Sequence, residues 1–281
     1  MSQDDLHATQ NQITIPIIGY HRSALSQKFG IPRQPNLVAL PSVIEMIAPY
    51  DTPEAFSGIE EFSHLWISWY THHNHLTLGS KSQSHETISE DTADNVFKPD
   101  CKPVFKPKVR PPRLGGNTKL GVFATRTTYR PSQLGLSVVE LVRVEVMTGS
   151  VRLHIRGADM VDGTPIVDIK PYIGYSDALS EAICGFAPDK PPLKQVVCEA
   201  QAAADFEKYC DQSDSDLNIE DKHIIQQLIA QDPRPAYRQR DTQRTYYMSY
   251  KHYDIGFLMQ YEFEDNTTQP KLCIVSIQPH L

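Results

Sequence analysis

The chain of 281 residues carries a net charge of −7, with 40% hydrophobic and 22% charged residues. This composition is typical of a globular protein with one or two domains and a substantial core. No apolar run approaches the roughly 18 residues that a membrane-spanning helix needs, so we expect no membrane partner.

The chain begins with a polar and acidic stretch, "MSQDDLHATQNQ". We expect residues 1–12 to be a disordered lead-in and not a signal peptide. The 5 cysteines are odd in number and widely spaced, and they include no Cys-x-x-Cys pair. This spacing argues against a disulfide framework or a cysteine zinc site, and it favours a reducing, cytoplasmic location.

Short runs rich in β-branched and aromatic residues follow, separated by turn residues. In "VRLHIRG" the apolar residues Val151, Leu153 and Ile155 alternate with polar ones, as in a half-buried strand. One short helix is expected at 52–62, with Thr52 as its N-cap and a proline at its first position. Because no helices alternate with the runs, they predict antiparallel β architecture in the form of a closed barrel. The expected strands are 13–22, 37–47, 64–73, 120–129, 136–146 and 151–161.

The composition changes twice along the rest of the chain. Residues 75–103 are polar and poor in apolar side chains, which predicts an exposed insertion. A proline-rich linker at 186–194 precedes a helix at 216–231 that has one apolar stripe. Further strands are expected near 195–200, 244–253, 255–263 and 271–278. The sequence thus predicts a mainly β protein, with a β-barrel domain at 13–175 and a small α+β domain at 190–281.

A concentrated basic segment lies at residues 105–137 of this acidic chain. It contains "RPPR" and an "LGG" turn but no acidic residue. A solvated loop is the simpler interpretation of such a charge run. Arginines on a proline-stiffened backbone are also suited to bidentate contact with phosphate, so the segment favours an anionic partner. Its basic residues are Lys106, Lys108, Arg110, Arg113, Lys119, Arg126 and Arg130.

The stretch "DMVDGTPIVDIKPY" at 159–172 brings Asp159, Asp162 and Asp168 close together. Its "VDGTP" is ordinary chemistry for a β-turn between strands, and the turn need have no other role. Such a turn also exposes backbone groups that can bind a base edge, and a neighbouring carboxylate could hold ribose hydroxyls or accept a proton. Both interpretations stay open.

Histidines cluster in "HLWISWYTHHNH", at His64, His72, His73 and His75. No acidic residue accompanies them at metal-ligand spacing, so we expect no metal. Histidines that border a pocket at the end of a strand are the favoured interpretation.

A second arginine-rich stretch, "AQDPRPAYRQR", lies at 230–240. It either stops a helix or presents arginine and tyrosine to single-stranded RNA. Neither G-x-G-x-x-G, G-x-x-x-x-G-K-[ST], G-x-S-x-G nor H-E-x-x-H occurs in the chain. A nucleotide-like ligand would therefore need a site of another kind than the Rossmann fold.

Six motifs in order resemble the TsaA-like, or TrmO, family of tRNA (adenine-N6)-methyltransferases. They are "PRQPNLV" (32–38), "GIEEFSHLW" (58–66), "RPPRLGGN" (110–117), "GVFATRTTYRPSQLGLS" (121–137), "MVDGTPIVDIKPY" (160–172) and "QDPRPAYR" (231–238). The resemblance implies a non-Rossmann β-barrel that binds S-adenosylmethionine (SAM), a homodimer, and a C-terminal domain that assists with tRNA. The implied reaction methylates N6 of threonylcarbamoyladenosine at position 37.

The resemblance also implies site residues. The cofactor site would contain Pro32, Arg33, Gln34, His72, His73, Arg126, Leu134, Val161, Asp162, Gly163 and Thr164. We hypothesise that tRNA is bound by Arg110, Arg113, Arg130, Arg234 and Arg238. Loss of the N6 proton is expected to be assisted by Asp232 or Asp162, or by the carboxylate of the modification itself, with Tyr237 and Arg234 positioning the base.

Two rival functions explain some of the same residues. A non-catalytic SAM-sensing RNA-binding protein would use the same arginines and turn. A metal hydrolase would use the histidines. We rank the methyltransferase first because of the six ordered motifs.

Overall fold

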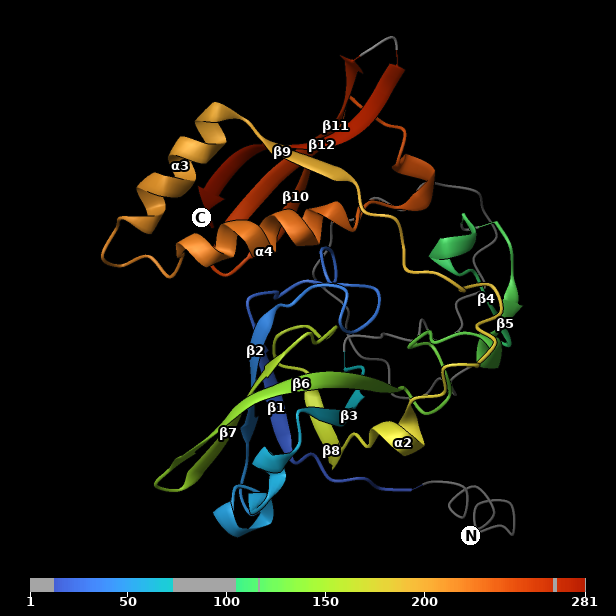
Figure 1. Ribbon diagram of the computed structural model, residues 1–281, viewed down its shortest axis with the longest axis vertical. Helices are drawn as coiled ribbons and strands as arrows, with labels where there is room; N and C mark the ends of the chain where they lie inside the picture. Colours follow the sequence, from blue (N-terminus) through green and yellow to red (C-terminus); the bar gives the residue numbers. More distant parts are fainter. Residues whose placement is uncertain (1–12, 73–104, 116, 265–266, 281) are drawn as a thin grey trace, which may run out of the picture.

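The computed structural model describes residues 13–72, 105–115, 117–264 and 267–280, and it contains two main sheets (Figure 1). The predicted lead-in at 1–12 and the predicted insertion at 75–103 lie outside the described residues, as does His73. Within the described residues, no helix combines the length and apolarity that crossing a membrane requires.

The first sheet is a closed antiparallel barrel with strand order β1-β2-β7-β6-β3-β8. Val151, Leu153 and Ile155 all point into its core, so the alternation read from the sequence is confirmed. The mainly β fold with a closed barrel is likewise confirmed. The strands are β1 Gly19–Ser23, β2 Pro41–Met46, β3 His64–Tyr70, β6 Leu134–Met147, β7 Ser150–Arg156 and β8 Pro165–Pro171.

The second sheet has the order β10-β11-β12-β9, with β9 parallel to β12, and two helices pack against it (Figure 1). Helix α4 (Ile219–Ala230) begins at a capping box, in which Asn218 and Asp221 each bind the other's backbone amide. Helix α3 (Ala200–Cys210) was not expected from the sequence, because only Ala202 and Phe206 of it are buried. The strands are β9 Gln195–Cys198, β10 Tyr246–Tyr250, β11 Tyr253–Glu264 and β12 Thr267–Pro279.

Two predicted elements are wrong. The helix expected at 52–62 is a pair of 3-10 turns, η1 Pro53–Phe56 and η2 Ile59–Glu61, because Gly58 between them has φ +83°. Thr52 is not a side-chain cap, since its hydroxyl donates to the carbonyl of Pro49.

The prediction of a strand at 120–129 is also wrong. The strand observed there, β5, contains only Leu120–Gly121. A 3-10 turn, η4 Val122–Ala124, follows it, and the Thr125 hydroxyl donates to the Val122 carbonyl. Side chains thus satisfy backbone groups that a strand would have paired with a neighbour. Among the described residues, β5 pairs only with β4, Lys108–Val109.

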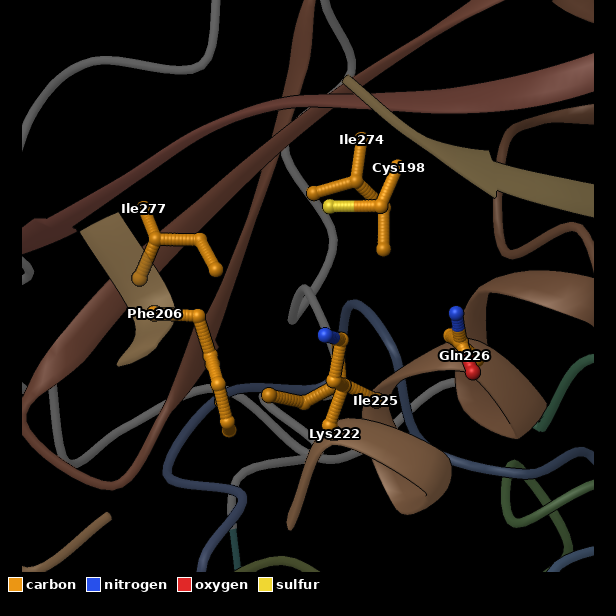
Figure 2. A pocket seen from close by; sticks show the side chains of 7 residues that line it. All are labelled: Cys198, Phe206, Lys222, Ile225, Gln226, Ile274 and Ile277. Carbon is orange, nitrogen blue, oxygen red and sulfur yellow. The ribbon is translucent and has the colours of Figure 1, made fainter. Parts of the chain in front are cut away.

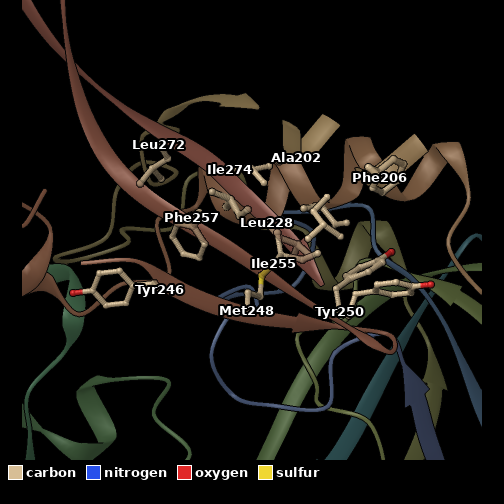
Figure 3. Close-up of a cluster of buried hydrophobic side chains, with 14 of the residues drawn as sticks. Ala202, Phe206, Leu228, Tyr246, Met248, Tyr250, Ile255, Phe257, Leu272 and Ile274 are labelled. Atoms are coloured by element: carbon tan, nitrogen blue, oxygen red, sulfur yellow. The ribbon is translucent and has the colours of Figure 1, made fainter. Parts of the chain in front are cut away.

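Residues 24–40, which connect β1 to β2, lie between the barrel and the second sheet, and we call them the bridging segment (Figure 1). Leu25, Val38 and Leu40 of this segment are buried in the same cluster as the side chains of α3, α4 and the second sheet. Figure 3 shows the part of this cluster that lies on the sheet and the helices. The core of the C-terminal half is therefore completed by residues from the beginning of the chain.

Candidate functional site

A cavity of about 260 Å³ lies where the barrel meets the bridging segment. This volume is close to the lower end of the range for small-molecule sites, roughly 300–1,000 Å³. Four parts of the chain line it: the bridging segment, the end of β3, the loop before β6 and the connection from β7 to β8. The lining residues are Lys28, Ile31, Trp69, Thr71, His72, Thr128, Tyr129, Asp159, Met160, Val161 and Thr164.

Asp159 carries the titratable carboxyl of this cavity wall. Burial raises its pKa to about 6, although a hydrogen bond from Ser137 and the positive charge of Arg126 favour the ionised form. The Ser137 hydroxyl donates to Asp159 Oδ1 at 2.5 Å and accepts from Trp69 Nε1 at 3.0 Å. Trp69 fits there because Gly135 has no Cβ, which would otherwise collide with the indole ring. The cavity thus holds a fixed carboxyl that changes charge near neutral pH.

The turn Val161–Thr164 forms another part of the wall, and β1 holds it in place. His21 is fully buried, burial lowers its pKa to about 4, and its neutral ring donates from Nδ1 to the Val161 carbonyl at 3.0 Å. The amide of Gly163 donates to the His21 carbonyl at 2.7 Å. The Asp162 carboxylate accepts the Ser23 amide at 3.0 Å. This bond gives Asp162 a visible role in shaping the turn.

Several residues that the sequence placed at the cofactor site do lie at this cavity. His72, Val161 and Thr164 line it, and Asp162 and Gly163 belong to the same turn. Arg126 is exposed, and its guanidinium donates to the Leu136 carbonyl at 3.4 Å while its charge acts on Asp159. The other predicted residues, Pro32, Gln34 and Leu134, are not among the lining residues; Pro32 is buried, and Gln34 and Leu134 are half-buried.

Arg33 points elsewhere. Its guanidinium donates to the backbone carbonyls of Asp232 and Arg234, at 3.4 and 3.5 Å. These carbonyls belong to the loop after α4, so Arg33 contacts the C-terminal half and does not line the cavity.

Asp232 and Arg234 form a buried ion pair, which corrects two predictions. Their exposed fractions are 3% and 0%, and Arg234 binds both carboxylate oxygens, at 2.7 and 3.0 Å. Arg234 also donates to the carbonyls of Gln239 and Asp241. A carboxylate and a guanidinium that are sealed in this way cannot accept a proton from bound tRNA or contact its phosphates. In this structure the pair instead holds together the loop after α4.

The remaining predicted tRNA residues divide by exposure. Arg110, Arg113 and Arg238 are exposed, whereas Arg130 is half-buried and donates to the carbonyls of Thr125 and Thr127. Arg130 therefore holds its own loop, which makes it a weaker candidate for tRNA contact than the exposed arginines.

Exposed aromatic rings accompany the accessible arginines. Tyr237 is 81% exposed, with the Arg238 guanidinium 5.7 Å from its ring centroid. Phe123 is 73% exposed and stacks on Phe105 within the basic segment, with 6.2 Å between ring centroids. Rings beside arginines are typical of surfaces on which unpaired bases stack. The pair of phenylalanines was not expected from the sequence, because Phe123 was assigned to a strand.

The bridging residues Lys28 and Ile31 were not expected as site residues, and Asp159 was named only as one of three neighbouring aspartates. Asp159 stands between Ala158 and Met160, which are both buried in the structure, and its apolar neighbours were the signal that the sequence offered. The sequence pattern had favoured Asp162 and Asp232 for the carboxylate role instead.

A second, much smaller cavity lies between α3, α4 and the second sheet (Figure 2). Its volume is about 10 Å³ and its wall is mostly apolar, so it holds at most about one water molecule. No group of three or more histidine, cysteine or acidic side chains arranged to hold a metal ion occurs among the described residues.

Two protein-family models match the chain. The tRNA-methyltransferase O N-terminal domain matches residues 20–178. The TrmO C-terminal domain matches residues 191–270. The first match includes the cavity and almost all of the barrel, and the second includes β9, β10, β11 and the beginning of β12.

Individual relatives agree with these matches. The chain is 38% identical over 236 residues to the tRNA (adenine(37)-N6)-methyltransferase of Escherichia coli, which covers 82% of this chain and 86% of the relative. It is 40% identical over 230 residues to a putative S-adenosylmethionine-dependent methyltransferase of Pseudomonas aeruginosa, with coverage of 82% and 85%. The crystal structure of TrmO from Pseudomonas aeruginosa superposes with a TM-score of 0.67 at 28% identity, over 95% of this chain and 99% of that one.

Proposed function

Because the chain belongs to the TrmO family of tRNA methyltransferases, we propose that it methylates N6 of threonylcarbamoyladenosine at position 37 of tRNA. The enzyme is an S-adenosylmethionine-dependent tRNA (adenine-N6)-methyltransferase, as its relatives are named. The observation that supports the reaction is the cavity of about 260 Å³ with a carboxyl whose pKa is about 6.

The residues of the cavity fit the chemistry of SAM. Trp69 and Tyr129 offer aromatic faces, which bind an adenine ring by stacking and a sulfonium by cation–π attraction. Lys28 offers a cation for the carboxylate of the methionine part, and Ile31 and Met160 offer apolar surface. When bound, SAM supplies an electrophilic methyl group on a positively charged sulfur. Alignment of the two reacting atoms is then the main demand on the protein.

Asp159 is the residue that we assign to the proton. N6 of the modified adenosine is a urea-type nitrogen and a poor nucleophile, so the loss of its proton should be assisted. With a pKa of about 6, Asp159 is mostly ionised at neutral pH and is able to accept that proton. Ser137 fixes the orientation of the carboxyl. Asp159 thus takes the role that the sequence had suggested for Asp232 or Asp162.

The tRNA is proposed to lie along the accessible arginines Arg110, Arg113 and Arg238. The exposed rings of Phe123 and Tyr237 provide stacking surfaces for bases that leave the anticodon stack. A cytoplasmic enzyme is the corresponding expectation, and the thiols support it because Cys184, Cys198, Cys210 and Cys273 are all free.

A homodimer is proposed as the working form. Its support is apolar surface after the barrel, where Tyr175 and Ile183 are 92% and 98% exposed in the single chain. Side chains of this kind are commonly covered by a partner. Sedimentation of the purified protein would test this proposal separately from the reaction.

Mass spectrometry of nucleosides tests the reaction itself. Unmethylated tRNA that contains threonylcarbamoyladenosine is incubated with SAM and either wild-type protein, Asp159→Asn or Arg126→Ala. The expected result is one added methyl on the modified adenosine with the wild type and a strong reduction with both variants. SAM binding without any methylated nucleoside would contradict the proposal and favour a SAM-sensing RNA-binding protein.

A further inference from the structure

Side chains of the bridging segment contact both the cavity and the core of the C-terminal half. Lys28 and Ile31 line the cavity, and Ile31 also packs against the core of the C-terminal half. Leu25, Val38 and Leu40 of the same segment are buried in this core, with exposed fractions of 0%, 2% and 0%. The bridging segment therefore forms one wall of the cavity, while its own packing partners lie more than half the length of the sequence away.

Aromatic packing provides the most specific of these contacts. Phe29, next to Lys28, stacks on Phe257 of β11 and on Tyr246 of β10, with centroid distances of 6.1 and 6.2 Å. The next residue, Gly30, has φ +95°, and a Cβ there would lie 2.5 Å from Met248. The segment is thus fitted closely to β10 and β11 at the point where its neighbouring side chains reach the cavity.

Polar contacts add to this attachment. The amide of Lys251 donates to the Ala24 carbonyl at 2.7 Å. Arg33 donates to the carbonyls of Asp232 and Arg234, and the buried ion pair between these two residues fixes the loop that presents them. The attachment therefore covers both the beginning and the middle of the segment.

The same segment is bonded to the wall of the cavity. The Asp162 amide donates to the Leu25 carbonyl at 2.8 Å, so the turn Val161–Thr164 is held by a residue whose side chain is in the C-terminal core. A displacement of Leu25 or Phe29 would move Lys28, Ile31 and this turn together. Packed contacts of this kind transmit displacement because interiors are dense and stiff.

We propose that the C-terminal half is a positioning element for the SAM cavity, and that Phe257 is a positioning residue which acts through Phe29. This inference rests on the proposed function, because it takes the cavity as the SAM site. It assigns the C-terminal half a role in binding the cofactor, in addition to any contact with tRNA. The coupling is reciprocal. The free energy by which the packing of β10 and β11 on the bridging segment strengthens SAM binding equals the free energy by which bound SAM strengthens that packing.

A matched pair of substitutions separates this role from general loss of stability. Phe257→Leu and Phe206→Leu both shorten a fully buried ring of the same hydrophobic cluster, and Figure 3 shows the two rings well apart. Phe257 stacks on Phe29, whereas the ring of Phe206, on α3, lies beneath Lys222. Both variants should lower Tm to a similar extent. Only Phe257→Leu should disturb the cavity.

The readouts are the Kd for SAM by calorimetry and the KM and kcat for methylation of tRNA. We expect Phe257→Leu to raise Kd and KM for SAM by about fivefold or more, the lower end for coupled sites, with kcat at saturating SAM near the wild-type value. Phe206→Leu should leave Kd unchanged. Equal Kd values for both variants and the wild type, or an equal rise in both variants, would overturn the inference. Absence of SAM binding to the wild type would instead overturn the proposed function.

Hydrogen exchange provides a second measurement that needs no variant. In the wild-type protein, SAM should slow amide exchange in β10 and at Lys251 more than in α3. Unchanged exchange at β10 and Lys251 in the presence of saturating SAM would also overturn the inference.

Discussion

The Ser137 hydroxyl donates a hydrogen bond to Asp159 at 2.5 Å and receives one from Trp69. This arrangement leaves the Ser137 hydroxyl with a single orientation, directed at the carboxyl. It places a fixed acid of shifted pKa in the wall of the cavity. The first two predictions concern this carboxyl.

Asp159→Asn should lower the rate of methyl transfer by about 10²–10⁴-fold, the usual contribution of a positioned base. Because the amide keeps the shape of the carboxyl, the Kd for SAM should change little. Asp168→Asn is the matched control, since Asp168 is an exposed carboxyl on β8 beside Lys170. Rates and Kd values measured for both variants test the assignment, and a fully active Asp159→Asn would refute it.

The reaction should speed up with rising pH. Burial raises the pKa of Asp159 from 3.8 to about 6, so kcat/KM for tRNA should increase through an apparent pKa near 6 and then level off. The effect on stability has the opposite sign. Between pH 3.8 and about 6 the folded state holds the extra proton on Asp159, so the contribution of Asp159 to the free energy of unfolding falls as pH rises through this window. Asp159→Asn should remove both contributions, and a comparison of the variant with the wild type by denaturation at several pH values would show the effect on stability.

Arg234→Met should destabilise the protein by about 3–5 kcal/mol, because it leaves the buried Asp232 carboxylate without its partner. Arg238→Met should cost less than about 1 kcal/mol, since Arg238 pairs with Asp241 at the surface. Urea unfolding of the two variants compares them directly. Equal urea midpoints for the two variants would show that the buried ion pair contributes no more to stability than the surface pair does.

Arg110→Ala and Arg113→Ala should each weaken tRNA binding and reduce the salt dependence of the affinity. The slope of log K against log[salt] should become shallower by about one for each phosphate that the protein no longer neutralises. Arg130→Ala should leave this slope unchanged, because the guanidinium is already bonded to the carbonyls of Thr125 and Thr127. Binding titrations at several salt concentrations distinguish the two groups of arginines.

Gly30→Ala should be more harmful than Gly149→Ala. Both glycines have positive φ, +95° and +72°, so both substitutions carry the strain of a left-handed backbone, roughly 1–2 kcal/mol. Only at Gly30 would the new Cβ also meet Met248. We expect a larger fall in Tm and weaker SAM binding for Gly30→Ala, and partial recovery of both in Gly30→Ala/Met248→Ala. Recovery in neither property would show that the contact with Met248 is unimportant.

The barrel could be predicted from the sequence because its strands carry a local signal. Val151, Leu153 and Ile155 alternate with polar residues, and the structure confirms their burial. The pairing of β6 with β7 is local too, because only Thr148 and Gly149 separate the two strands, whereas the pairing of β6 with β3 is not local and no residue pattern specifies it. The strand expected at 120–129 shows the limit of this signal, because Thr125 and Arg130 satisfy the backbone there.

The site was only partly predictable for a similar reason. His72, Val161 and Thr164 were placed at the cofactor site, and they line the cavity. The roles of Asp232 and Arg234 were wrong because charged side chains are rarely fully buried, and only the tertiary fold reveals that these two pair inside. Lys28 and Ile31 reach the cavity because the C-terminal half holds their segment, which no local pattern records.

The position of the bridging segment also affects the order in which the molecule can fold. Ala24 and Phe29 are made well before their partners Lys251 and Phe257, which lie on the other side of the barrel strands in the sequence. Domains generally fold as units from the N-terminus during synthesis. Here the barrel can close as soon as β8 is complete, but the wall of the cavity has to wait for β10 and β11. The ability to bind the cofactor should therefore arise only after β10 and β11 are made, and a nascent chain stalled before residue 246 should contain a barrel without a finished site.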